Sequence, residues 1–385
     1  MRGYLLYLIK ESANRATVMK SLIPYPLTSV ELNTLAERCT SKIDIIIQHL
    51  SELVDICRNR DDEQITRYVH RRYQEYHREL EWYEQYGIAV LNVECADFGY
   101  LNKLISRILR ESNIPLNIPA VASFSNEYYF FAPGVKVIFI PPAESRFLLH
   151  MADLYHELGH YVSSMRQELQ LANIGRGYSQ CLEAIKLHYV KIVSRRIIES
   201  RQADLIANTI AIHDRWKSKW FEEIFCDLFA AYLVGPAYAW SHVHLIMKKN
   251  EGIRVFAFNP RKLSTHPADE ARFRAVLLAL KEQGFDVSAI EKKWHEFFLP
   301  NGEDGDEPYY EAFPDELLQE LTNHTLDAFR QTCLVGCKPQ DLENTSVTSV
   351  VSTLNRCWAE FWVSPHTFRD YESTEVEQLR GTTGG

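Results

Sequence analysis

The sequence lacks the long apolar segments and the cysteine spacing that mark two large classes of protein. A membrane-spanning helix needs about 18 or more apolar residues in succession. The best candidate, residues 224–240, is interrupted by Asp227, Gly235 and Pro236. The eight cysteines show no spacing typical of a disulfide framework. We therefore expect no membrane span and a reducing compartment, the cytoplasm.

An export signal and an excess of basic residues are also missing. The apolar run in the opening residues, MRGYLLYLIKES, is too short for a signal peptide, and no small-residue cleavage site follows it. The formal net charge of −9 argues against broad nucleic-acid binding. With 46% hydrophobic and 24% charged residues among 385, the chain has a globular composition and is long enough for more than one folding unit.

The motif H-E-x-x-H is the most informative feature that is present, as His156, Glu157 and His160. Residues four apart share one face of a helix, so both imidazoles can reach one metal ion, and Glu157 beside them can deprotonate a bound water. Ser145 is the expected N-cap of this helix. Its expected apolar face consists of Phe147, Leu148, Met151, Leu154, Leu158 and Val162. The alternative is an ordinary amphipathic helix with two core or solvated histidines, because so short a motif also occurs by chance.

The stretch WFEEIFCDLFAAY, residues 220–232, offers a pair of carboxylates. A catalytic zinc usually takes three protein ligands and leaves one position for water. Glu223 and Asp227 share a helix face, so Glu223 can be the third ligand while Asp227 accepts the outer ring N–H of a ligand histidine. Glu222 competes for the ligand role, but Cys226 rather than an acid stands four residues after it. We therefore prefer Glu223.

The stretch STHPADEARF, residues 264–273, brings a further histidine and an arginine. Pro267 keeps His266 out of helical geometry, so His266 should lie at a turn that leads into the helix of Arg272. Either side chain, placed opposite the zinc, could stabilise the oxyanion that forms when a peptide carbonyl is attacked. The alternative is an ordinary helix start with a surface arginine.

In this order, HELGH, E-x-x-x-D and S-T-H-P with a following arginine resemble the gluzincin metallopeptidases, most closely the branch with the prenyl-protein endopeptidases and the bacterial membrane heat-shock proteases. The resemblance covers about the middle half of the chain. It implies the following site: zinc ligands His156, His160 and Glu223, general base Glu157, Asp227 beside a ligand histidine, and substrate or transition-state contacts from His266 and Arg272. The chain departs from that branch because it lacks transmembrane helices and has Ala268 where a second proline is common.

The expected fold is α+β and mainly helical. A zincin-like metallopeptidase core with a small sheet is expected at residues 91–284, between an N-terminal helical domain at 1–90 and a C-terminal helical accessory region with a flexible tail at 285–385. Strand-like runs at 122–131 and 136–142, about a Pro-Gly pair, predict a hairpin. The resembled fold implies that Lys136 to Ile140 pairs with an extended substrate by strand addition.

Residues 167–219 separate the motifs. Here the sequence predicts a glycine-rich break at IGRGYS and then a helical run over 181–213, which serves either as a lid over the site or as a scaffold insertion.

The expected function is hydrolysis of peptide bonds in an intracellular protein or peptide substrate, with Zn²⁺ as the cofactor. The helical arms offer a surface for a protein partner. The alternative is a scaffold or sensor that zinc stabilises and whose peptidase activity is latent or lost. Glu157 favours the enzyme, because a structural zinc site needs no base and usually fills its fourth position with protein.

Overall fold

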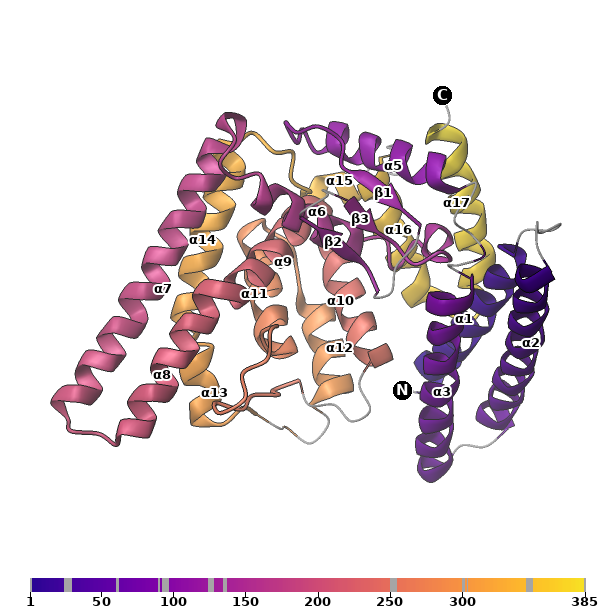
Figure 1. Ribbon diagram of the computed structural model, residues 1–385, viewed down its shortest axis with the longest axis horizontal. Helices are drawn as coiled ribbons and strands as arrows, with labels where there is room; N and C mark the ends of the chain where they lie inside the picture. The colour runs from indigo at the N-terminus through magenta and orange to yellow at the C-terminus, as the bar shows by residue number, and fades with distance from the viewer. Residues whose placement is uncertain are drawn as a thin grey trace.

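The computed structural model describes residues 2–23, 30–59, 62–88, 91, 97–123, 128–133, 137–249, 255–299, 302, 304–343 and 349–383. Over these residues the chain is mainly helical with one small sheet, as predicted (Figure 1). The helices are α1 (Arg2–Ser21), α2 (Val30–Asn59), α3 (Glu63–Tyr83), α5 (Asp97–Glu111), α6 (Asp153–Ser164), α7 (Ala172–Ile198), α8 (Ala203–Arg215), α9 (Phe221–Val234), α10 (Pro236–Lys249), α11 (Asp269–Glu282), α12 (Ser288–Phe298), α13 (Glu307–Ala312), α14 (Asp315–Gln331), α15 (Pro339–Glu343), α16 (Val350–Val363) and α17 (Phe368–Thr383). None of the helices in the described part of the chain combines the length and the apolar content that crossing a bilayer requires.

The sheet has three strands, β1 (Ala120–Ala122), β2 (Phe130–Ala132) and β3 (Val137–Phe139), in the order β1-β3-β2. Strands β2 and β3 are antiparallel and form the predicted hairpin, although Gly134 of its turn lies outside the described residues. Strand β1 pairs with the other side of β3 in parallel. Both edges of β3 are therefore occupied, and the expectation that Lys136 to Ile140 binds substrate is wrong for Val137–Phe139; Lys136 itself is not described. The edge strands of the described sheet are β1 and β2.

Helix α6, which carries H-E-x-x-H, begins later than predicted. Ser145 is buried in a 3₁₀ turn, Glu144–Arg146, and the N-cap of α6 is Ala152, which has no side-chain cap bond. Between the two, backbone N–H groups bond three residues back, as His150 does to Phe147. The chain thus winds through successive tight turns after Pro141 and Pro142, and Ser145 is not the N-cap of α6.

Helix α9 lies at the centre of the helical layers and packs against α6, α10, α11 and α14. From Ile224 to Val234 every residue of it is buried, which fits a helix that is apolar on all sides. Strand β2 lies on the other flank of α6, where the rings of Phe131 and Tyr161 are 5.7 Å apart. The H-E-x-x-H helix is thus held between the sheet and α9.

Residues 167–219 form the helical hairpin α7–α8, and α7 runs alongside α14 (Figure 1). The predicted break at IGRGYS is wrong, because these residues lie inside α7. A Cβ on Gly177 would lie 2.5 Å from Cβ of Ala328. The glycine therefore allows the close approach of α7 and α14 rather than interrupting the helix.

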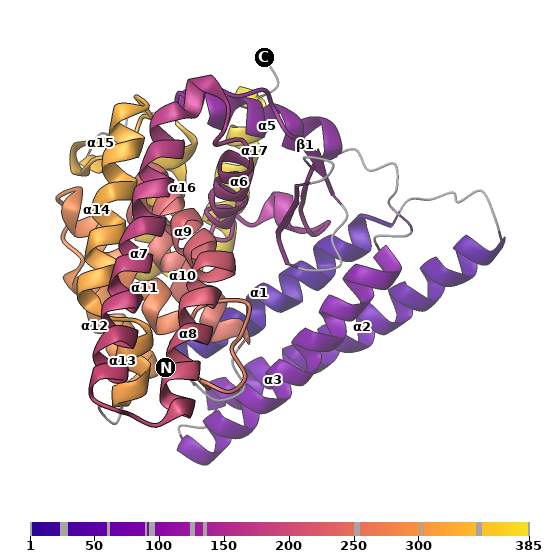
Figure 2. The same ribbon diagram turned by 60° about the vertical axis from the view of Figure 1, so that its left-hand side comes forward.

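Helix α1 lies between the α2–α3 pair and the rest of the molecule (Figure 2). Its Tyr4 ring is 5.1 Å from Phe297, and its Tyr7 ring is 4.4 Å from Phe361. Residues 1–90 are therefore in side-chain contact with the segment assigned to the C-terminal region. That region ends in α17, which remains helical as far as Thr383 and packs against α5.

Candidate metal centre

Three of the predicted site residues lie together between α6 and α9. Nε2 of His156 is 3.5 Å from one oxygen of Glu223, and Nε2 of His160 is 3.7 Å from the other. Around a tetrahedral zinc ion with bonds of about 2.1 Å, neighbouring ligand atoms are ~3.4 Å apart. The three side chains have donor types that suit zinc, and each histidine lies near one oxygen of Glu223, with His156 and His160 on one helix and Glu223 on another.

Asp227 lies behind His156, one helical turn after Glu223. Its Oδ1 is 2.9 Å from Nδ1 of His156, as the sequence predicted for the outer ring nitrogen. Burial alone would raise the pKa of Asp227, but the Arg272 guanidinium and His156 hold it far below its ordinary value. The ionised carboxylate therefore keeps the proton of the neutral imidazole on Nδ1, and Nε2 presents its lone pair to the centre.

The charge balance of the centre favours a cation. Burial alone would lower the pKa of His156, but hydrogen bonds to Asp227 and Glu223 raise it to about 10. Burial alone would raise the pKa of Glu223, but its contacts with His156 and the charge of Arg272 lower it to about 2. The carboxylates thus stabilise positive charge at His156, which is the electrostatic condition that a divalent metal ion requires.

Arg272 lies next to Asp227 and donates to it. Its Nε and Nη2 donate to the two oxygens of Asp227 at 2.8 and 2.7 Å, and Nη2 is 4.0 Å from Glu223. The side chain of Arg272 is 14% exposed, and its guanidinium pairs with Asp227. These contacts position Asp227, and the predicted contact of Arg272 with the substrate or the transition state stays a prediction.

Tyr238 completes the group around Asp227, and the sequence analysis missed it. Its hydroxyl donates to Oδ1 of Asp227 at 2.6 Å and lies 3.2 Å from Nδ1 of His156. Gly235, with φ of 72°, forms the turn by which α10 folds back along α9. No motif spacing indicates this contact; the only signal is a tyrosine in a buried run, whose hydroxyl needs a partner.

Two other donors lie close to the histidines. Oε1 of Glu222 is 3.7 Å from Nδ1 of His160, so Glu222 faces the outer nitrogen of that ring while Glu223 faces Nε2. Sγ of Cys226 lies within 4.8 Å of ring nitrogens of both histidines. Burial, and then Glu223, raises the pKa of this thiol well above its ordinary value, so it has the properties of a small apolar residue. The ionised carboxylate of Glu223 is therefore a better candidate for the third ligand than this thiol.

Glu157 and His266 are the two remaining residues that the sequence predicted for the site. Glu157 follows His156 on α6 and is 7% exposed. His266 lies in the turn before α11, as predicted, with its side chain 60% exposed and Nε2 3.8 Å from Glu223. The position of His266, accessible and near the carboxylate, is suited to a group that reaches a bound substrate.

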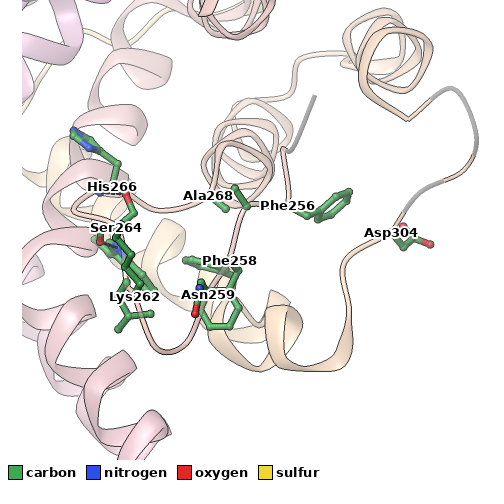
Figure 3. Close-up of a pocket in the computed structure, with 12 residues that line it drawn as sticks. Phe256, Phe258, Asn259, Lys262, Ser264, His266, Ala268 and Asp304 are labelled. Carbon is green, nitrogen blue, oxygen red and sulfur yellow. Dashed lines mark hydrogen bonds between the residues drawn. The ribbon is translucent and has the colours of Figure 1, made fainter. Parts of the chain in front are cut away.

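A cavity of about 560 Å³ opens beside His266 (Figure 3). Its walls come from the end of the π turn Trp216–Trp220, from the loop before α11 and from the residues around α13. The lining residues are Trp220, Phe256, Ala257, Phe258, Asn259, Lys262, Leu263, Ser264, His266, Ala268, Asp304 and Phe313. The cavity and the metal centre therefore share one residue, His266.

A second group of potential ligands, Glu11, His150 and His244, is buried between α1 and α10 and was not predicted. Glu11 is 2.5 Å from Nε2 of His150 and 3.2 Å from Nε2 of His244. The Lys248 ammonium lies 3.6 Å from Glu11 and 3.4 Å from His150. Because a cation of the protein already occupies this cluster, it forms an ion network that binds α1 to the rest of the molecule.

Comparison of the chain with family models, with curated proteins and with solved structures returns no match.

Proposed function

We propose that this protein is a zinc-dependent endopeptidase with a gluzincin-type site on a zincin-like core, acting on an intracellular protein or peptide. The observation that carries the proposal is the position of Glu223, whose two oxygens each face Nε2 of a different H-E-x-x-H histidine, at 3.5 and 3.7 Å. His156, His160 and Glu223 would hold the ion. A zinc ion there supplies a Lewis acid that activates water and polarises the scissile carbonyl.

The remaining side chains act on the water, the oxyanion and the ligand histidine. Glu157 accepts a proton from the attacking water and passes it to the leaving amine. His266 donates a hydrogen bond to the developing oxyanion from the exposed side of the centre. Asp227, fixed by Arg272 and Tyr238, keeps His156 in the required tautomer.

The backbone of the substrate would bind along the edge of the sheet. Strand β2 is an edge strand in the described sheet and packs against α6 through Phe131 and Tyr161, next to His160. Addition of an extended peptide to β2 binds main-chain groups and leaves the choice of residues to neighbouring pockets.

The test uses purified protein and a set of unfolded proteins. We expect cleavage that a chelator abolishes and that about one equivalent of zinc restores. Glu157→Gln should keep the metal and lower the rate by about 10²- to 10⁴-fold, the usual contribution of a general base. Cleavage that ignores the chelator, or that persists unchanged in Glu157→Gln, would contradict the proposal.

The ligand set is tested by metal content after dialysis. We expect Glu223→Gln to lose zinc, whereas Glu222→Gln and Cys226→Ala should retain it. Zinc loss from Cys226→Ala together with retention in Glu223→Gln would assign the third position to the thiol.

One observation favours the second candidate, a zinc-stabilised scaffold that binds a protein partner. Helix α7 exposes several large apolar side chains, namely Leu187, Val190, Ile197 and Ile198. The two functions separate in cells that depend on this protein: a scaffold would retain full activity with Glu157→Gln and lose it with His156→Ala through unfolding, whereas a peptidase would lose activity in both.

A further inference from the structure

We propose that the cavity beside His266 is a specificity pocket that takes one bulky apolar side chain, aromatic or long aliphatic, of the substrate residue next to the scissile bond. This inference rests on the proposed peptidase function and adds the class of residue at which the protein cleaves.

The first argument is the place of the cavity. His266 lines it and lies 3.8 Å from Glu223. Trp220, another lining residue, precedes Glu223 by three positions in a continuous helix, and its indole N–H donates to the carbonyl oxygen of Ser264 at 3.1 Å. The cavity therefore shares the wall formed by His266 and Trp220 with the surroundings of Glu223, beside the place where a peptide bond would be held.

The second argument is the distribution of polarity. Except for the exposed Ala257, the apolar lining residues are buried or half-buried: Trp220, Phe256, Phe258, Leu263, Ala268 and Phe313. The polar ones are exposed: Asn259, Lys262, Ser264, His266 and Asp304. Figure 3 shows Phe256, Phe258 and Ala268 between Asp304 on one side and Ser264 and His266 on the other. An ionised substrate side chain that entered would lose its hydration without gaining a buried partner, so the pocket selects against charge.

The third argument is that the wall is packed in advance. The ring of Phe313 is 4.7 Å from Trp220 and 5.9 Å from Phe258, so three separate segments meet at one aromatic cluster. Trp216 supports the cluster from behind, at 5.9 Å from Phe313. A wall of mutually packed rings need not be ordered when the ligand binds, which lowers the entropic cost of binding. The volume of about 560 Å³ also lies within the range typical of ligand pockets, ~300–1,000 Å³.

Most of this wall lies outside the three motifs of the sequence. Phe256, Phe258 and Lys262 precede the S-T-H-P stretch, and Asp304 and Phe313 follow α12. The selectivity is therefore a property of this chain's own loops rather than of the metal-binding framework.

The test has a cleavage arm and a binding arm. In the cleavage arm, the sites cut in a peptide library should show a large apolar residue at one position beside the scissile bond, preferred over alanine by about 10- to 200-fold in kcat/KM, as expected for filling an apolar pocket. Ala268→Leu should narrow the cavity and lower this preference about tenfold. Phe258→Ala should enlarge it and shift the preference toward the largest residues. Leu169→Ala, at a site 88% exposed outside the cavity, should change neither. Zinc content and melting temperature confirm that the variants are folded.

In the binding arm, Glu157→Gln protein is irradiated with a peptide that carries a benzophenone side chain, and the crosslinks are mapped by mass spectrometry. We expect them in the segments of Phe256, Phe258 and Phe313. If the protein cleaved peptides but showed no apolar preference, or a preference that the cavity variants did not change, the pocket would be overturned and the peptidase function would remain. Crosslinks at the pocket without any cleavage would overturn the peptidase and leave an apolar binding site. If the protein neither cleaved any peptide nor formed crosslinks at the pocket, both the peptidase and the pocket would be overturned.

Discussion

Asp227 is the residue on which the most contacts at the metal centre depend. Its two oxygens receive Arg272, Tyr238 and the outer nitrogen of His156. Each of these partners comes from a different helix, so one buried carboxylate joins α6, α9, α10 and α11. The orientation of His156 therefore depends on side chains that are not among the proposed metal ligands.

Asp227→Asn should lower zinc affinity by about 10- to 100-fold, the usual effect of losing the carboxylate partner of a ligand histidine. The amide cannot balance the Arg272 charge and no longer fixes the imidazole tautomer. Competition with a chromophoric chelator measures the affinity. Asp214→Asn, at an exposed site, is the control and should bind zinc normally. Unchanged affinity in Asp227→Asn would show that the contact does not act on the metal site.

Local spacing in the sequence was enough to predict which residues of the centre share a helix face. His156 and His160, and likewise Glu223 and Asp227, are four residues apart in helices, so one period placed each pair on one face. Arg272 and Tyr238 depend on how α10 and α11 fold back on α9. The partner of Arg272 could not be predicted, because an arginine six residues after a histidine is equally compatible with pointing at substrate or at Asp227.

At the scale of elements, the contact between α6 and α9 sets the distance between the ligands. Gly159 stands between His156 and His160 and faces Cys226 of α9. A Cβ added there would lie 2.9 Å from Cα of Cys226 and 3.2 Å from its Sγ. The backbone of α9 cannot move away at this point without carrying Glu223 with it.

We therefore expect Gly159→Ala to destabilise the fold by about 1–3 kcal/mol through overpacking and to weaken zinc binding at the same time. Adding Cys226→Ala should not restore binding, because the closest atom is backbone. Gly381→Ala, in α17 with nothing within 4 Å of its new Cβ, is the matched control. Denaturant titration and chelator competition give the two quantities, and normal zinc affinity in Gly159→Ala would refute the argument.

The attachment of α1 depends on a buried ion network. His150 lies between Glu11 of α1 and Glu144, at 2.5 and 2.8 Å. Arg15 of α1 also pairs with Glu144 and with Glu84. Burial alone would lower the pKa of His150, but the charges of Glu144 and Glu11 outweigh burial and the repulsion of Lys248, and raise the pKa to about 9.

This shift predicts a pH dependence of stability. A histidine whose folded pKa lies above its unfolded value of about 6.5 contributes its full stabilisation below that value and loses it as the pH rises through about 9. We therefore compare the free energies of unfolding of the natural protein and of His150→Gln. The stability advantage of the natural protein should fall by up to about 3 kcal/mol between pH ~6.5 and pH ~9. His295→Gln, on the exposed surface of α12, should give a flat difference. A flat difference for His150→Gln would mean that the buried histidine is neutral throughout.

The element boundaries that the sequence did not predict correctly share one physical cause. Gly177 of IGRGYS serves the packing of α7 on α14, Ser145 is enclosed in a turn, and Val137–Phe139 is paired on both edges. In each case, contacts with a segment distant in sequence determined the structural role of the residues. Local preferences for helix, turn or strand cannot show such contacts.

At the scale of the whole molecule, one apolar core joins regions that composition separates. It includes Tyr4 and Leu8 of α1, Leu158 of the H-E-x-x-H helix and Phe361 of α16. The hydroxyl of Tyr4 reaches Nδ1 of His244, 240 residues away, at 2.5 Å. The spacing of apolar residues showed that these helices have apolar faces, but it cannot show which faces pack together. The division of the chain into domains at residues 90 and 284 therefore stays a prediction.

Because the core is continuous, we expect a destabilising substitution in α1 to destabilise the metal centre as well. Ile9 is fully buried, and Ile9→Ala should cost about 2–5 kcal/mol through lost burial and an unfilled cavity. In guanidinium titrations, far-UV circular dichroism and zinc release to a chromophoric chelator should follow one transition, and Ile9→Ala should displace both midpoints equally. Ile45→Ala, at a half-exposed site on α2, should change the stability by no more than about 0.5 kcal/mol. If helical signal were lost in Ile9→Ala before any zinc appeared, α1 would unfold separately, and the N-terminal helices would form a unit of their own despite the shared core.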